Sequence, residues 1–148
     1  MFVTWYLSTV KPKPTSTNKN YIIGVTAFTR AAIENLLERI SSVQKQCHKT
    51  NDFKIIRLVK DLKKKPLNGL EECKAESLPK KVKDRKIGIP GKPIVIGGTV
   101  WDWYRVRKEW QFGWVGCDMM IIDEGSQVSK QLIEILCKIR ILNLFVFF

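Results

Sequence analysis

The sequence has few of the residues that bind metals or form disulfides. It holds one histidine and four cysteines among 148 residues. Cys47, Cys73, Cys117 and Cys137 lie far apart without a C-x-x-C pair, whereas zinc ligands usually come in close pairs. We therefore expect no structural metal site. Widely spaced free thiols are typical of a reducing compartment, so we expect the nucleus or the cytoplasm.

Long apolar runs and acidic residues are also scarce. The first residues show no basic leader ahead of an apolar core of signal-peptide length. Residues 135–148 are apolar, but Lys138 and Arg140 interrupt them and the run is too short to span a bilayer. We therefore expect neither export nor membrane insertion. The net charge of +12 fits a polyanionic partner or a lysine-rich surface that serves solubility alone, and charge does not separate the two.

The order of apolar runs and periodic segments predicts an α/β domain. Runs that are apolar on both faces are typical of strands in a parallel sheet. Apolar residues recur at helical spacing from Phe28 to Val43, and the Thr29 hydroxyl is placed to cap that helix. The expected strands are residues 21–27, 53–59, 93–100 and 119–122, with the apolar tail, 141–148, as a further candidate.

Two segments fit neither pattern. Residues 11–18 contain two prolines among small polar residues, which indicates an irregular connection after a helix end at residues 2–10. In residues 60–92, basic residues outnumber acidic residues roughly two to one, and prolines and glycines interrupt any helix. We expect a mobile basic loop there. Its cluster from Lys80 to Lys86 has the composition of a nuclear import signal, which also arises by chance.

The apolar run Met119–Ile122 ends in two adjacent carboxylates, Asp123 and Glu124. Acids at the carboxyl end of a buried strand lie where open α/β sheets bind their ligands. Their mutual repulsion is costly unless a cation offsets it, as Mg²⁺ with a nucleotide does. One carboxylate then holds the water shell of the metal, and its neighbour accepts a proton from an attacking water. The alternative is a strand that ends in a solvated turn, where acids are common.

The string M-M-I-I-D-E-G-S-Q resembles motif II, the Walker B motif, of superfamily 1 helicases. The resemblance is strongest to the branch that contains RNA-decay and replication-associated helicases. It implies that Asp123 binds Mg²⁺, that Glu124 activates water, and that Gln127 senses the γ-phosphate of ATP. Gly125 replaces the alanine that is commoner in the family.

Two further stretches resemble motifs of the same branch. V-T-A-F-T-R-A-A-I-E-N-L-L is similar to motif Ia, which implies that Phe28, Thr29 and Arg30 contact the nucleic-acid backbone. I-V-I-G-G-T is similar to motif Ic, which implies a phosphate contact by Thr99, and its glycines let a phosphate or another backbone approach. The alternative for the first stretch is an ordinary strand–turn–helix unit, whose helix start still offers amides to a phosphate.

Aromatic residues gather after the third of these strands. Four of the five tryptophans lie in residues 101–114, among arginines and lysines. Aromatic rings interleaved with cations suit the stacking of bases along a bound backbone. The alternative, which we favour for most of these rings, is that they cover the sheet. Trp101 and Tyr104, nearest the strand end, are the expected exceptions.

Parts of the family's ATPase site are missing from the sequence. No G-x-x-x-x-G-K-[ST] loop occurs, so no lysine and amide cradle of that kind holds the β- and γ-phosphates. We also expect the chain to begin just after that loop and to stop before motif III. We expect residues 1–148 to be a truncated first motor domain, α/β with a mainly parallel sheet of the RecA-like P-loop type. Residues 1–20 would be a residual helix and linker.

The resemblance implies ATP hydrolysis, with ATP and Mg²⁺ as cofactors, coupled to unwinding of a nucleic acid. The partner would be single-stranded DNA or RNA, and the sequence does not distinguish them. We expect this chain to be inactive alone because phosphoryl transfer needs all the positioning elements together. Two alternatives are a non-catalytic basic module that binds nucleic acid and a gene remnant without independent function.

Overall fold

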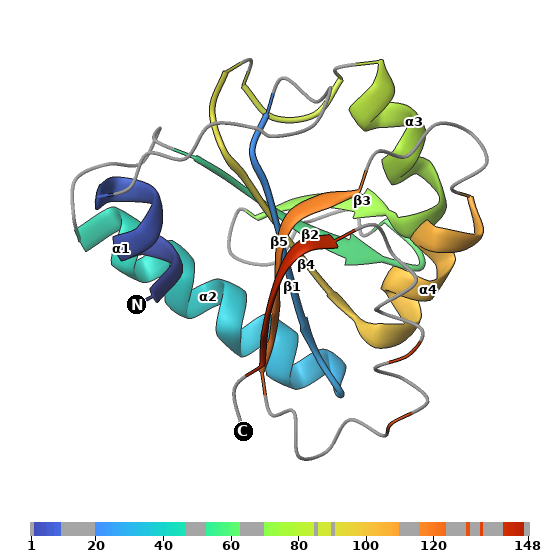
Figure 1. Cartoon of the computed structure of the whole chain (residues 1–148), viewed down its shortest axis with the longest axis horizontal. Coiled ribbons are helices and arrows are strands. Elements are labelled where there is room, and N and C mark those ends of the chain that lie inside the picture. The colour runs from blue at the N-terminus through green and yellow to red at the C-terminus, as the bar shows by residue number, and fades with distance from the viewer. Residues whose placement is uncertain are drawn as a thin grey trace.

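The fold is built on one parallel sheet (Figure 1). The computed structural model describes residues 2–9, 20–46, 53–62, 70–84, 86–89, 91–109, 116–123, 130, 134 and 141–146. The elements in these residues are α1 Phe2–Thr9, β1 Ile22–Ala27, α2 Arg30–Gln46, β2 Lys54–Val59, β3 Glu71–Lys74, the 3₁₀ helix η2 Ala75–Ser77, α3 Leu78–Lys83, β4 Ile94–Thr99, α4 Val100–Lys108, β5 Cys117–Ile122 and β6 Ile141–Val146. None of the described helices is long and apolar enough to cross a membrane.

The strand order is β3-β2-β4-β1-β5-β6, and all neighbouring strands pair parallel. Parallel neighbours need crossover connections, and the helices α2 and α4 lie in the connections that follow β1 and β4. The three central strands, β1, β4 and β5, are buried along their full length. Central strands covered on both faces therefore explain the continuous apolar runs of the sequence.

Two apolar layers cover the two faces of the sheet. On one face, α1 and α2 contribute Leu7, Ile33 and Leu37 to a core with β1 residues such as Val25. On the other face, α3 and α4 contribute Leu78, Trp103 and Val106 to a second core. Figure 1 shows α1 and α2 on one side of the strands and α3 and α4 on the other. The fold is thus α/β, a parallel sheet with flanking helices on both faces, in agreement with a partial RecA-like domain.

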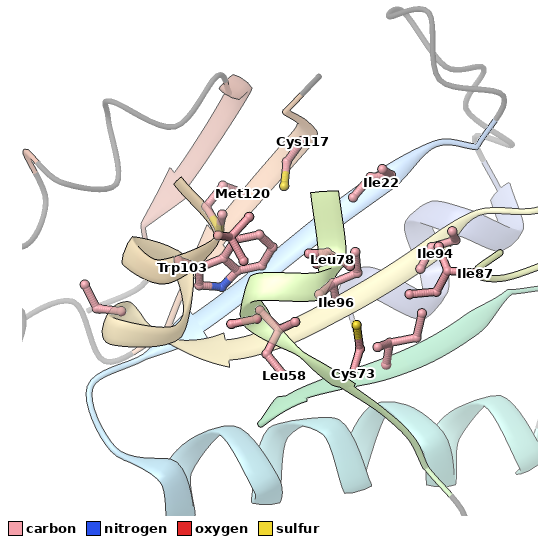
Figure 2. Packing of buried hydrophobic residues seen from close by; sticks show 14 of the residues in the cluster. Ile22, Leu58, Cys73, Leu78, Ile87, Ile94, Ile96, Trp103, Cys117 and Met120 are labelled. Atoms are coloured by element: carbon pink, nitrogen blue, oxygen red, sulfur yellow. The ribbon is translucent and has the colours of Figure 1, made fainter. Parts of the chain in front are cut away.

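Trp103 anchors α4 to the sheet. Its side chain is fully buried, and its indole Nε1–H donates a hydrogen bond of 3.2 Å to the Val25 carbonyl oxygen. Figure 2 shows the ring reaching from α4 toward the sheet, in the same cluster as Met120 and Leu78. A buried indole needs such a partner for its N–H. This ring covers the sheet, as expected for most of the tryptophan cluster; Trp110 and Trp114 lie outside the described residues.

The expected strands are confirmed with small shifts of their ends, and the apolar tail forms β6 beside β5. The prediction of a mobile loop over residues 60–92 is wrong for a large part of that segment. It contains β3, η2 and α3, and Cys73, Ala75 and Leu78 from these elements are buried in the core. Only isolated positions of an edge strand and a short helix face inward, so the segment lacks an apolar run. Apolar residues also recur at helical spacing after Gln127, which predicts a helix there, and most of that stretch lies outside the described residues.

Candidate functional site

The sheet register brings three distant stretches of the chain together. Ala27 of β1 is paired with Thr99 of β4, and Thr26 is paired with Ile122 of β5. The Asp123 amide also donates a hydrogen bond of 2.8 Å to the Thr26 carbonyl oxygen. The helices that follow β1 and β4 lie on opposite faces, which makes this pair of strand ends the topological switch point where open α/β sheets bind ligands. All three motif-like stretches therefore end at one edge, the carboxyl edge of the sheet.

The turn after β1 begins α2 as the sequence predicts. The Thr29 Oγ accepts a hydrogen bond of 3.2 Å from the Ala32 amide, which satisfies one of the free donors of the first helical turn. Thr29 is exposed, and the Phe28 ring beside it is 41% exposed. An exposed phenylalanine next to a capped helix start offers a flat apolar surface at the carboxyl edge.

Arg30 joins the two helical layers across the end of the sheet. Its Nη1 donates to the Leu58 carbonyl oxygen at 2.7 Å and lies 2.9 Å from Asp102 Oδ2, while Nη2 donates to Asp102 Oδ1 at 3.1 Å. Arg30 opens α2 and Asp102 lies in the first turn of α4, on the other face of the sheet. These contacts fix the direction of the Arg30 guanidinium, and the Arg30 side chain as a whole remains 39% exposed.

Asp102, which was not among the residues expected at the site, organises the start of α4. Its Oδ2 accepts hydrogen bonds from the Thr99 amide at 2.8 Å and from the Thr99 hydroxyl at 3.0 Å, and the Thr99 Oγ accepts from the Asp102 amide at 3.3 Å. This reciprocal arrangement is a capping box. Asp102 is fully buried, and Arg105 Nη1 also donates to it at 3.1 Å. The spacing T-x-x-D at the end of an apolar run is the signal that predicts this cap.

The cap changes the interpretation of Thr99. Its hydroxyl and amide both face the Asp102 carboxylate, and only 7% of the residue is exposed. The carboxylate thus occupies the donors that a phosphate would take at this helix start. The two glycines before Thr99 pack against side chains, since a Cβ on Gly97 would lie 2.6 Å from Leu37 Cδ2 and one on Gly98 would lie 2.9 Å from Leu58 Cδ1. The glycines thus allow close side-chain packing.

Trp101 and Tyr104 differ from Trp103 in their surroundings. Trp101 is 52% exposed and Tyr104 is 40% exposed, whereas Trp103 is fully buried. Trp101 and Tyr104 were expected not to cover the sheet, and the structure places both rings outside the core. Residues three apart on a helix are neighbours on its surface, so these two rings share one face of α4.

The acidic end of β5 is described in part. Asp123 follows β5 directly and is half-buried, whereas Glu124 and Gln127 lie outside the described residues. A half-buried carboxylate at the end of a central strand suits an ion such as Mg²⁺, which prefers oxygen ligands and retains several waters. Among the described residues, no group of three histidine, cysteine or acidic side chains is placed to hold a metal. Of the expected nucleotide site, the structure thus places Asp123 alone.

The buried ion cluster around Arg57 was not foreseen. Arg57 of β2 is 1% exposed; its Nη1 donates to Glu34 Oε1 at 2.6 Å, and its Nη2 donates to Glu72. Its Nε has no hydrogen-bond partner in the part of the chain that the structure describes. Glu34 comes from α2 and Glu72 from the edge strand β3, so Arg57 connects three elements. The run K-I-I-R-L-V gives no hint of this, because its partners lie 23 and 15 residues away.

The two described thiols are buried and are expected to be unreactive. Burial raises the pKa of Cys73 from 9.0 to about 11, and burial raises the pKa of Cys117 further above its usual range. Because the folded pKa is raised, the neutral thiol stabilises the fold below pH ~9, and this contribution is lost as pH rises through the folded value.

At pH 8, native Cys73 and Cys117 should resist alkylation by iodoacetamide, since only about one thiol in a thousand is ionised at a pKa near 11. Peptide mass spectrometry should find both unmodified in the native protein and modified in guanidinium. Labelling of either at the same rate in both states would contradict the burial of these side chains.

No protein-family model matches the chain, and no curated protein matches it. Among solved structures, the fold is similar to a nuclease-deletion mutant of the Type ISP restriction-modification enzyme LlaGI in complex with a DNA substrate mimic. The match has a TM-score of 0.60 at 10% sequence identity and covers 88% of this chain. This chain spans 13% of the length of the LlaGI chain. The likeness therefore concerns the fold.

Proposed function

We propose that this chain is part of the first motor domain of a superfamily 1 helicase and binds nucleic acid at its carboxyl edge. The observation that carries the proposal is the meeting of the three motif-like stretches at that edge, through the pairs Ala27–Thr99 and Thr26–Ile122. The carboxyl ends of parallel strands meet at one edge of a sheet, and this edge is where open α/β sheets bind their ligands. The LlaGI structure, whose fold is similar, is a complex with a DNA substrate mimic.

The backbone of the nucleic acid would meet Phe28, Thr29 and Arg30. The Arg30 guanidinium is the strongest candidate for a phosphate contact, because it is held in place by Asp102 and Leu58 while its side chain stays open to solvent. Positioned guanidinium groups bind phosphate oxygens through parallel hydrogen bonds. Thr99 would act one step away, since its hydroxyl holds the Asp102 carboxylate that orients Arg30.

A nucleotide would be held at the neighbouring end of β5. Asp123 would contact the water shell of Mg²⁺, Glu124 would accept a proton from the attacking water, and Gln127 would contact the γ-phosphate. Mg²⁺ and ATP, when bound, would supply the charge neutralisation and the transferred phosphoryl group. The placement of Asp123 next to Thr26 of β1 supports a link between this site and the nucleic-acid edge.

A second candidate is a basic module that binds nucleic acid without catalysis. It is favoured by the absence of G-x-x-x-x-G-K-[ST] from the sequence, since that loop supplies the main contacts to the phosphates of a nucleotide. Both candidates require the same nucleic-acid edge. They differ in whether Asp123, Glu124 and Gln127 form a nucleotide site.

The edge is tested by the affinity of the chain for a single-stranded oligonucleotide at several salt concentrations. We expect weak binding without sequence preference that falls steeply with salt, because phosphate contacts release counterions. Arg30→Gln should weaken binding. It should also reduce the slope of log affinity against log salt concentration by about one, because one phosphate contact is lost. Arg39→Gln is the matched control, since it removes the same charge from an exposed position further along α2. Equal effects of the two variants, or no binding at low salt, would refute the proposed edge.

A further inference from the structure

Helix α4 carries two different faces. Asp102, Trp103 and Val106 are buried against the sheet and the cap. The opposite side is made by residues at spacings of three, four and seven, which fall on one stripe of a helix. We call this stripe the outer face of α4; its members are Trp101, Tyr104, Arg105 and Lys108.

The two rings on the outer face have no role in the core. Trp101 is 52% exposed and Tyr104 is 40% exposed. The helix already anchors itself through Trp103, whose ring is fully buried and hydrogen-bonded to Val25. Large rings left in water next to one another are typical of a binding surface.

The cations on the same face indicate the charge of the partner. Lys108 is exposed, and the Arg105 side chain is 34% exposed although its guanidinium also contacts Asp102 and lies 3.9 Å from Glu76. The buried Asp102 charge is shared between Arg30 and Arg105, so two guanidiniums surround one carboxylate. Together with the net charge of +12, the face is complementary to an anionic chain that also offers flat apolar groups.

We infer that the outer face of α4 stacks the bases of an unpaired nucleic-acid strand, with Lys108 and Arg105 beside its phosphates. This rests on the proposed function and deepens it, since it assigns recognition of bases to a helix face separate from the phosphate contact at Arg30. The face is continuous with the carboxyl edge, because α4 starts directly after Thr99. Trp101 lies in the first turn of α4, next in the chain to Asp102, which holds the Arg30 guanidinium. Paired bases are already stacked inside a duplex, so only an unpaired strand offers them to the rings.

The test compares a thymidine oligonucleotide with an abasic oligonucleotide of the same length, which has the same phosphates but no bases. The unaltered chain should bind the thymidine strand about 25-fold tighter or more, because each of the two ring–base stacks is expected to strengthen binding by at least about fivefold. Trp101→Ala with Tyr104→Ala should bind both strands equally, at the abasic level. Trp101→Phe with Tyr104→Phe keeps flat rings and should keep most of the preference.

The outcomes separate this inference from the proposed function. Equal, salt-dependent binding of both strands by the unaltered chain would overturn the stacking inference and leave the phosphate edge standing. A base preference that survives in the double alanine variant would also overturn it, since the bases would then be bound elsewhere. No binding of either strand would overturn both. Circular dichroism checks that the variants fold, and the comparison of the two strands on the unaltered chain needs no variant.

Discussion

Removal of the Glu72 carboxylate by Glu72→Ala should lower the free energy of unfolding by about 3–5 kcal/mol. The reason is the buried Arg57 charge, which would keep only Glu34 as a partner, and Glu34 is 27% exposed. A buried guanidinium that loses a hydrogen-bonded carboxylate retains the cost of its desolvation without the compensation. The effect should appear as a lower urea midpoint, and the edge strand β3 should lose its protection from hydrogen exchange first.

Glu71→Ala is the matched control for this change. Glu71 precedes Glu72 on the same strand and is exposed, so its removal should alter stability by no more than about 0.5 kcal/mol. Replacing Arg57 and Glu72 together by methionine should recover most of the loss, because no buried charge then remains. Equal destabilisation by Glu71→Ala and Glu72→Ala would contradict a buried ion cluster at this position.

The second large effect is an absence of ATP turnover despite the Asp123-Glu124 pair. A metal-binding carboxylate and a base act only when the γ-phosphate is held in line with the attacking water. The sequence contains no G-x-x-x-x-G-K-[ST] loop to hold it. That loop supplies the principal contacts to the phosphates of a nucleotide, so without it most nucleotide affinity should be lost.

The measurement is ATP hydrolysis with Mg²⁺ and excess single strand, comparing this chain with Glu124→Gln. Both should show the same background rate. Turnover that is measurable in the unaltered chain and lost in the variant would mean that another part of the chain binds the phosphates. That result would favour a complete ATPase over a basic binding module.

Much of the sheet was predictable from the sequence, for a physical reason. β1, β4 and β5 are buried on both faces, so apolar residues dominate each of them and make them recognisable by composition, although Thr26, Thr99 and Asp118 are buried polar members. β3 is a four-residue edge strand whose single buried residue, Cys73, leaves no such pattern. Its place depends on Glu72 and Arg57, a contact between distant residues that no local rule predicts.

The carboxyl edge was predictable in outline and not in its contacts. The position of Asp123 follows from the apolar run before it, and the Thr29 cap follows from the start of a periodic segment. The burial of Asp102 was not predictable, because an acid within an aromatic and basic stretch carries no local sign of being buried. Its burial is possible because Thr99, Arg30 and Arg105 supply donors from three directions, and only the folded chain brings them together.

The central claim is that nucleic acid binds at the carboxyl edge of the sheet. The most direct test is a titration of ¹⁵N-labelled chain with a single-stranded oligonucleotide, followed by amide chemical shifts. The account predicts the largest changes in Phe28, Thr29, Arg30 and Trp101, with little change at the opposite edge around Asn20 and Gly116. Changes confined to the basic helix α3, Leu78–Lys83, or centred on the opposite edge, would contradict it.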